Sequence, residues 1–419
     1  MDVPDTIQLM GDKQWQEIKS RLTGKFNKMM KGLFRQKGAQ LDINILASDE
    51  AQEFITTHAG ILDGGFQKVE MSDKMRERLT RSNYIFSGIK TFHELNEAFP
   101  SMLDENGNKK PFERFLNDVQ KINDTYNANY LHAEYNFVQA SATMAAKWEQ
   151  FSEDGDRYNL QYRTAKDDKV RPEHAALDGV TLPMSDSFWE TYYPPNGWNC
   201  RCTVVQVRKQ KYPATEHTEA MSRGEEAMNG ERYNIFRFNS GKQGKTMPDY
   251  NPYTIRRCND CDVAKGKLKL GFVPDYQLCQ GCIMIRKCSE DRNRHNSAKA
   301  AKKSPEVKKL QGTTISNPDF NHEVLVTGGS IREWTNQPHK EYAAKNSILK
   351  HIAKVFREAN YIGVVDNFKQ KPGVIQSHLF ETTVLGDVSW IVIREYDDGR
   401  FILHSLSDGD RIKTGIRKE

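Results

Sequence analysis

Four cysteines in two closely spaced pairs form the clearest chemical signal in the chain. Cys258 and Cys261 belong to the run CNDC, Cys279 and Cys282 belong to CQGC, and 17 residues separate the two runs. Each pair can aim two thiolates at one point, and this spacing is typical of a tetrahedral four-cysteine zinc site. A short hydrophilic segment buries little apolar surface, so the metal would supply most of its folding free energy. The sequence therefore predicts a structural zinc ribbon here.

A second group of metal-ligand residues lies upstream of these pairs. Cys200 and Cys202 are two positions apart in the β-rich run 200–207, so we expect both side chains on one face of a strand. His174 is a candidate third ligand of a second metal, with Asp178 as a candidate fourth. The alternative is that both cysteines are small buried hydrophobic residues and that His174 is a hydrogen-bonded structural residue. The sequence leaves both interpretations open.

The last hundred residues contain the side-chain types that metal-free RNA cleavage needs. Such a reaction uses a base for the 2′-hydroxyl, an acid for the leaving oxygen and a cation for the phosphate. We expect His378 to be the base or acid, with Arg332 or Lys371 on the phosphate. Ser405 and Ser407 are expected to position the substrate at the end of the last strand.

Helices are expected to make up residues 10–150. Apolar residues recur there at steps of three and four, which predicts one buried face per helix. A wide aromatic seam follows along 124–151, and core packing explains it better than a cofactor site. Thr91 and Glu94 have the spacing of a capping box, which predicts a helix start between them. The first of these faces comprises Trp15, Ile18, Leu22, Phe26, Met29 and Leu33.

The pattern changes after residue 155. A short strand is expected at 159–164 and a short helix at 171–177, which begins with Pro172. Near the C-terminus, a helix is expected at 341–359. Four β-rich runs follow, and turn signals between the last three predict consecutive antiparallel hairpins. These runs are 361–366, 378–385, 388–396 and 400–406.

Composition restricts the class of protein. A chain of 419 residues is long enough for several domains, and 10% aromatic residues are too many for a disordered chain. Neither an apolar run of roughly 18 residues nor a secretory signal is present, which argues against membrane and secreted classes. Six of the seven cysteines lie in tight pairs, which favours metal ligation in a reducing cytoplasm.

Positive charge is concentrated in one part of the chain. The net charge is only +5, but residues 256–303 contain twelve Lys or Arg against five Asp or Glu. Such a patch favours a nucleic-acid or acidic-protein partner. For 297–309 alone, a solvated linker is an equal alternative.

The predicted fold is α+β and multidomain. A helical region covers 1–155 and a small α+β module covers 156–255. The zinc-ribbon-like segment then covers 256–288, and a basic linker covers 289–315. A helix plus an antiparallel β-meander completes the chain at 316–419.

The run from Tyr162 to Cys202 resembles the head-morphogenesis domain of the phage Mu protein F-like family. The family pattern is an aromatic-x-T, then D-x-x-VR-x-x-H-x-x-LDG, an FW and PP-x-G element, and a final CRC. About fifty residues carry this match. The matching residues here are Tyr162, Thr164, Asp167 or Asp168, Val170, Arg171, His174, Leu177, Asp178, Gly179, Phe188, Trp189, Pro194, Pro195, Gly197, Cys200, Arg201 and Cys202.

This resemblance implies a minor head protein of a phage or prophage. Such a protein would be made in the bacterial cytoplasm and carried in few copies inside the procapsid, near the portal. Its implied partners are portal and capsid proteins and the packaged DNA. No association with a membrane is implied. The predicted zinc ribbon is not part of the minimal family pattern.

The C-terminal region, which includes the run GGSIREWTNQPHKEY at 328–342, resembles barnase–EndoU–colicin–RelE-like nuclease domains. The resemblance implies an RNase-like domain fused to the head protein, with RNA as its target. The alternative function is a DNA-binding accessory head protein whose C-terminal domain is a non-catalytic binding module.

Overall fold

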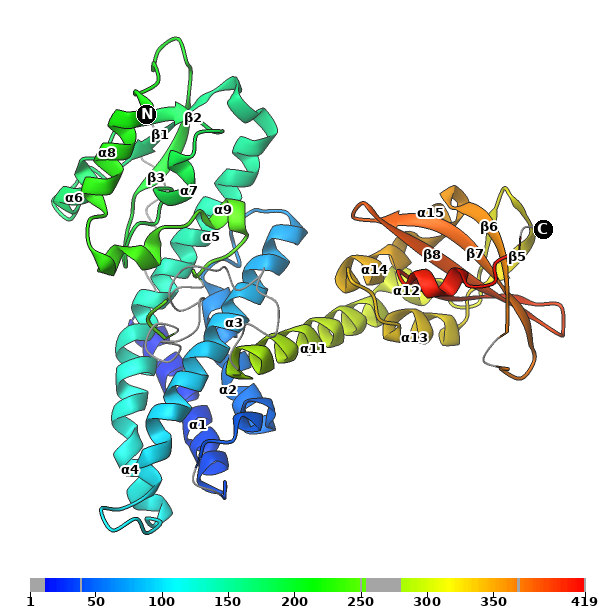
Figure 1. Cartoon of the computed structure of the whole chain (residues 1–419), viewed down its shortest axis with the longest axis horizontal. Helices are drawn as coiled ribbons and strands as arrows, with labels where there is room; N and C mark the ends of the chain where they lie inside the picture. The colour runs from blue at the N-terminus through cyan, green and yellow to red at the C-terminus, as the bar shows by residue number, and fades with distance from the viewer. Residues whose placement is uncertain (1–11, 38–39, 249–250, 254–279, 368–369, 418–419) are drawn as a thin grey trace. The chain divides into compact units, whose positions relative to one another are not determined.

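The computed structural model describes residues 12–37, 40–248, 251–253, 280–367 and 370–417 (Figure 1). The chain divides into two compact units, Met1–Ser289 and Glu290–Glu419. Within the described residues, every helix is too short or too polar to cross a bilayer.

Long helices build the first half of the first unit. The predicted apolar face of the first helix is confirmed, because Leu22, Phe26, Met29 and Leu33 are all fully buried. These side chains join one continuous core that extends through the whole first unit. The helices are α1 (Asp12–Phe34), α2 (Asp49–Gly64), α3 (Asp73–Ala98), α4 (Phe112–Asn123) and α5 (Leu131–Asp154).

The helix starts of α2 and α3 are set by serine caps. The hydroxyls of Ser48 and Ser72 accept hydrogen bonds from backbone N–H groups in the first turns of α2 and α3. The predicted helix start at Thr91 is wrong. α3 continues through this position, and the Thr91 hydroxyl donates to the carbonyl of Ser87, one turn earlier. Both Thr91 and Glu94 are buried inside the helix bundle.

A small antiparallel sheet follows α5. Its strands are β1 (Asn159–Arg163), β2 (Thr181–Pro183) and β3 (Thr203–Val207), in the order β2-β1-β3. β1 confirms the predicted strand, and α6 (Pro172–Ala175) confirms the short helix that Pro172 begins. In the central pairing, Arg163 lies opposite Thr203, so the chain before β3 is held beside the end of β1.

Short helices cover this sheet and join it to α5. They are α7 (Phe188–Thr191), α8 (His217–Ala227) and α9 (Ser240–Gln243). The indole of Trp189 donates to the carbonyl of Pro183, and the hydroxyl of Tyr193 donates to that of Met144 in α5. Gly241 in α9 lies so close to Trp148 that an added Cβ would sit 2.1 Å from the Trp148 Cβ. The sheet and helices of this unit therefore share one core.

The second unit is a six-stranded sheet with helices on one face. The strand order is β4-β5-β9-β8-β7-β6, and every pairing is antiparallel except β5 with β9. The predicted hairpins β7–β8 and β8–β9 are confirmed, whereas β4 and β5 were not predicted. The strands are β4 (Thr314–Asn317), β5 (Phe320–Leu325), β6 (Asn360–Asp366), β7 (Val374–Val384), β8 (Asp387–Tyr396) and β9 (Phe401–Ser407).

Two helices pack against one face of this sheet, α13 (Gly328–Asn336) and α15 (Ile352–Glu358). Between them in the chain, α14 (Tyr342–Ile348) packs against the same core through Ala344 and Ile348 (Figure 1). Trp334 and Phe356 from the helices pack with Phe380 and Ile391 from the sheet in the main core of the unit. A second, smaller cluster around Leu379 lies on the other face. The two clusters show that successive residues of β7 point to opposite faces.

The basic segment 289–315 was expected to be a linker, but it is largely helical. α11 (Gln280–Lys303) and α12 (Pro305–Lys309) cover most of it. Of the four cysteines of the predicted zinc ribbon, Cys258, Cys261 and Cys279 lie outside the described residues. Cys282 lies in the first turn of α11 by its backbone. The ribbon stays a prediction.

Candidate metal centre

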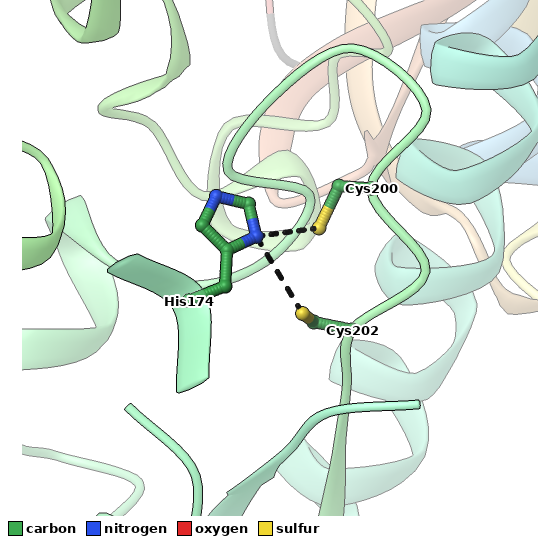
Figure 2. A group of neighbouring side chains, drawn as sticks. All are labelled: His174, Cys200 and Cys202. Carbon is green, nitrogen blue, oxygen red and sulfur yellow. Dashed lines mark hydrogen bonds between the residues drawn. The ribbon is translucent and has the colours of Figure 1, made fainter. Parts of the chain in front are cut away.

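Three potential metal ligands of the first unit come together around one ring nitrogen. His174 lies on α6, and Cys200 and Cys202 lie in the turn that leads into β3. The Nδ1 atom of His174 is 3.7 Å from the Sγ of Cys200 and 3.7 Å from the Sγ of Cys202 (Figure 2). All three ligand atoms lie within 4.8 Å of one another, and all three residues are buried.

These separations fit a tetrahedral zinc ion. Zn–S and Zn–N bonds of about 2.3 and 2.0–2.1 Å at a tetrahedral angle place nitrogen and sulfur about 3.6 Å apart. The two observed separations of 3.7 Å match this value without any rearrangement. Thiolate and imidazole are also the ligand types that zinc prefers in proteins.

The local fold explains why the two sulfurs meet the same nitrogen. The cysteines were expected to lie within a strand, but β3 begins only at Thr203. The chain at 200–202 instead forms the end of the turn that leads into β3, and the pairing of Arg163 with Thr203 holds the start of that strand. Both sulfurs nevertheless approach the same ring nitrogen, as was predicted for two side chains on one side of the chain.

Asp178 does not complete the site. Its Oδ1 accepts hydrogen bonds from the backbone N–H and the hydroxyl of Thr164, at 2.8 and 3.1 Å. Its Oδ2 lies 3.7 Å from the Nζ of Lys166. The carboxylate therefore fixes the loop after β1. Within the part of the chain that the structure describes, only His174, Cys200 and Cys202 form a ligand group of this kind.

The two thiols have opposite electrostatic environments. A hydrogen bond from Cys202 lowers the pKa of Cys200 well below its ordinary value, and the neighbouring His174 adds to this effect. The pKa of Cys202 is raised in turn, because Cys200 accepts its proton and because the thiol is buried. Ionisation of one thiol is thus already favoured, and metal binding requires the deprotonated form.

Arginines frame the loop that carries the cysteines. Arg171 donates through Nη2 to the backbone carbonyl of Trp198 at 2.6 Å. Arg201, between the two cysteines, binds Asp167 through two parallel hydrogen bonds of 2.5 and 2.7 Å. The Nε2 of His174 has no hydrogen-bond partner among the described residues. Its ring is held in place by burial.

The ligand group forms part of the wall of a cavity of about 560 Å³. Residues from α5, from the loop before α6 and from the cysteine turn surround this space. Positively charged side chains are the most frequent charged type in its wall. The lining residues are His132, Asn136, Ala165, Lys169, Val170, Arg171, His174, Asn199, Cys200, Arg201 and Cys202.

The second unit places His378 in a hydrogen-bonded cluster. Its Nδ1 lies 3.0 Å from the hydroxyl of Tyr361, and its Nε2 lies 3.0 Å from the Oε2 of Glu395. Burial alone would raise the pKa of Glu395, but hydrogen bonds from His378 and Gln376 outweigh it and lower the pKa. Both ring nitrogens of His378 are therefore engaged, and only 3% of the residue is exposed.

The two serines that were expected to position the substrate face away from His378. Ser405 lies opposite Val392, which lies opposite Leu379 in the next strand, so these three share one face of the sheet. His378 precedes Leu379 and points to the opposite face. Ser407 shares the face of Ser405, because it lies opposite Trp390, two positions before Val392.

The two expected phosphate-binding residues lie on separate elements. Arg332 is an exposed residue of α13. Lys371 is exposed in the connection between β6 and β7, where its backbone N–H donates to Asn367. Of the five expected catalytic residues, the strand register separates Ser405 and Ser407 from His378.

A buried charged cluster in the helix bundle was not predicted from the sequence. The Nζ of Lys90 lies 2.6 Å from Oε2 of Glu134 and 3.1 Å from Nε2 of His58. The hydroxyl of Tyr253 donates to the other oxygen of Glu134. Burial alone would raise the pKa of Glu134, but Lys90 and His58 outweigh it and lower the pKa to about 2. No signal in the sequence indicated this cluster, because α3 carries many other charged residues beside Lys90.

Comparison with known proteins finds similarity to F proteins of phage Mu and of a Mu-like prophage. Residues 106–205 match the family model described as Phage Mu protein F like protein. The Putative capsid assembly protein F of Escherichia phage Mu is 28% identical over 284 residues, which cover 62% of this chain and 61% of that protein. The Mu-like prophage FluMu F protein of Haemophilus influenzae is 32% identical over 102 residues, 24% of this chain and 22% of that protein.

These matches show that part of this chain is similar to phage Mu F-like proteins. The matched region 106–205 contains the whole of the candidate metal centre. The chain spans about three fifths of the length of the Escherichia phage Mu protein and about a fifth of the Haemophilus protein. No solved structure is significantly similar to the chain.

The C-terminal match is to a different family from the expected one. Residues 292–403 match the model described as Large polyvalent protein-associated domain 3. That description names no nuclease, so the resemblance to barnase–EndoU–colicin–RelE-like domains is not shown. The match begins close to the start of the second unit at Glu290.

Proposed function

We propose that this chain is a head morphogenesis protein of a phage or prophage, with its assembly function in the first unit. The observation that carries the proposal is the 28% identity over 284 residues with a protein named as a putative capsid assembly protein. The proposed partners are the portal and capsid proteins of the same phage. The proposed location is the procapsid interior, after synthesis in the bacterial cytoplasm.

We further propose that a zinc ion bound by His174, Cys200 and Cys202 stabilises this assembly module. The two equal nitrogen–sulfur separations of 3.7 Å support it. An ion at this position would join α6 directly to the turn before β3. Along the chain, these two segments are connected only through more than twenty residues. The four cysteines at 258–282 remain the proposed ligands of a second, structural zinc.

Nucleic acid is a further proposed partner of the basic region 256–303. Neutralising backbone phosphates with Lys and Arg gives binding that weakens steeply as salt rises. In a head protein, such a region would bind the phosphates of the packaged DNA.

RNA cleavage is the second candidate function, for the second unit. The observation that favours it is the pairing of His378 with Glu395, next to an exposed His322 that stacks on Phe401 with ring centroids 4.1 Å apart. A carboxylate that orients an imidazole is a common feature of general acid–base catalysis. The alternative is that this unit is a binding module and that the pair is structural.

The assembly proposal is tested by genetics in the phage or prophage that encodes the chain. Deleting the gene is expected to abolish complete heads in electron micrographs of induced cells, and wild-type protein supplied in trans should restore them. The double variant Cys200→Ser/Cys202→Ser should restore fewer heads, whereas the Cys288→Ser variant should restore them fully. Normal numbers of infectious, DNA-filled particles after deletion would refute the assembly role.

A further inference from the structure

The candidate metal centre supplies three protein ligands, and the structure shows no fourth among the described residues. Structural zinc sites in proteins have four protein ligands, whereas sites with three keep a position for an exogenous ligand. Asp178, the one carboxylate expected to complete the site, is bound to Thr164 instead. The fourth coordination position of a tetrahedral ion here is thus left for a ligand other than Asp178.

All three ligands belong to the wall of the same cavity of about 560 Å³. A metal ion held by them would therefore sit at the edge of this space. Ligand-binding clefts in proteins typically have volumes of about 300–1,000 Å³, so the space is large enough for more than a water molecule. An exogenous ligand could reach the ion from this side.

The charge of the cavity selects the kind of ligand. Two thiolates balance the two positive charges of zinc, so the metal centre itself would be neutral. Asp167 neutralises Arg201 through its paired hydrogen bonds. Lys169 and Arg171 also line the cavity, and neither forms an ion pair within the described part of the chain. The cavity therefore carries excess positive charge.

We propose that the fourth coordination position of this centre opens into the cavity and takes a phosphate oxygen. This proposal rests on the proposed zinc site. Arg171 and Lys169 would bind the remaining phosphate oxygens, a task for which guanidinium and ammonium groups are well suited. The phosphate would come either from a nucleic-acid backbone or from a free phosphate ion.

Cobalt substitution tests the proposal without reference to any biological activity. Cobalt(II) replaces zinc in tetrahedral sites, and its visible absorption bands respond to a change of ligand. Full-length protein carrying Cys258→Ser and Cys261→Ser should be loaded with cobalt and desalted, so that the predicted ribbon does not contribute. Inorganic phosphate and a short single-stranded oligodeoxynucleotide are then titrated separately, against perchlorate at equal ionic strength.

Phosphate is expected to shift the visible bands in a saturable way, and perchlorate is not. A shift with the oligonucleotide as well identifies nucleic acid as a source, and a shift with phosphate alone identifies the free ion. Lys169→Met should weaken phosphate binding several-fold and leave cobalt binding unchanged. Lys166→Met is the matched control, because it removes the same charge from a residue that does not line the cavity.

Two results would overturn the proposal, and they can be told apart. If cobalt binds in a tetrahedral thiolate site but neither phosphate source changes the bands, the fourth position is closed and this inference alone fails. If cobalt does not bind at His174, Cys200 and Cys202, the zinc site itself fails and the inference fails with it. If the ribbon variant is poorly folded, a second measurement is the difference between the spectra of the cobalt-loaded wild-type protein and the cobalt-loaded Cys202→Ser variant.

Discussion

The Nδ1 of His174 lies 3.7 Å from the sulfur of Cys202, 28 residues further along the chain. β1 brings the two segments to one end of the small sheet, because it pairs with β2, which follows the helix of His174, and with β3, which follows Cys202. A metal ion held by both residues would close a long loop across the small sheet. Cross-links of this kind stabilise a fold by restricting its unfolded chain.

Replacing Cys202 should therefore make the protein less responsive to zinc. A ligand that binds only the folded state adds about 2.7 kcal/mol when its concentration is 100 times the dissociation constant. Cys202→Ser should lose a stabilisation of about this size, measured as the zinc-dependent shift in thermal unfolding. Cys288→Ser, on α11 outside the ligand group, is the matched control and should keep the full shift. An equal zinc response in both variants would contradict the site.

The ion pair between Lys90 and Glu134 should be strongly coupled. Lys90→Met would leave the Glu134 carboxylate buried without its cation, which typically destabilises a protein by about 3–5 kcal/mol. The double variant Lys90→Met/Glu134→Leu should cost clearly less than the sum of the two single variants. Chemical denaturation followed by circular dichroism measures the unfolding free energy of the two single variants and the double variant. If the two single losses add up to the double loss, the pair contributes no coupling.

Stability should fall as the pH rises toward 8 because of Glu94. Burial raises the pKa of this carboxyl to about 8 in the folded protein, while the attraction of Lys90 opposes the shift and Glu134 and Glu97 add to it. The folded state thus keeps a proton that the unfolded chain releases near pH 4.5. The stabilising contribution is complete below that pH and is lost through pH 8, at up to about 1.4 kcal/mol per pH unit.

Glu94→Gln should remove this part of the pH dependence. Glutamine has nearly the same shape as the protonated acid and does not ionise. The difference in unfolding free energy between the wild-type protein and the variant should move in favour of the variant as the pH is raised from 5 to 8. A difference that stays constant over this range would show that Glu94 does not titrate there.

RNA cleavage by the second unit is tested by two substitutions on opposite faces of its sheet. Expression of the full chain in bacteria is expected to degrade cellular RNA, and His378→Ala should relieve this effect. Ser405→Ala should not, because Ser405 faces away from His378. RNA integrity on gels is the readout. If RNA stays intact when the wild-type protein is expressed, RNA cleavage is refuted and the binding-module alternative stands.

Periodicity predicted the elements that bury a continuous face. The α1 face and the long helix α5 follow from regular spacing of apolar and aromatic residues, and the hairpins of β7, β8 and β9 follow from the turn signals between β-rich runs. The start of a helix at Thr91 was mispredicted because its capping spacing also occurs in the middle of α3, where the hydroxyl bonds to the preceding turn. β4 and β5 are short strands that pair with each other, and only the parallel pairing of β5 with β9, far away in sequence, joins them to the rest of the sheet.

For the candidate sites too, local spacing predicted some features, and contacts between distant residues decided the others. Local spacing was sufficient to group Cys200 with Cys202, and the short helix that Pro172 begins placed His174 as a candidate partner. The position of Asp178 could not be deduced, because its use depends on a hydrogen bond to Thr164 across a loop. Likewise, His378 and Ser405 are both plausible by type, and only the strand register shows that they lie on opposite faces.

The zinc content of purified protein tests the central claim most directly. Full-length wild-type protein and the Cys200→Ser/Cys202→Ser variant should be expressed with zinc, freed of excess metal, and measured by elemental analysis per chain. The account predicts that the variant contains one zinc ion fewer than the wild-type protein, with the remainder due to the predicted ribbon. Equal zinc content in the two proteins would contradict a metal centre at His174, Cys200 and Cys202.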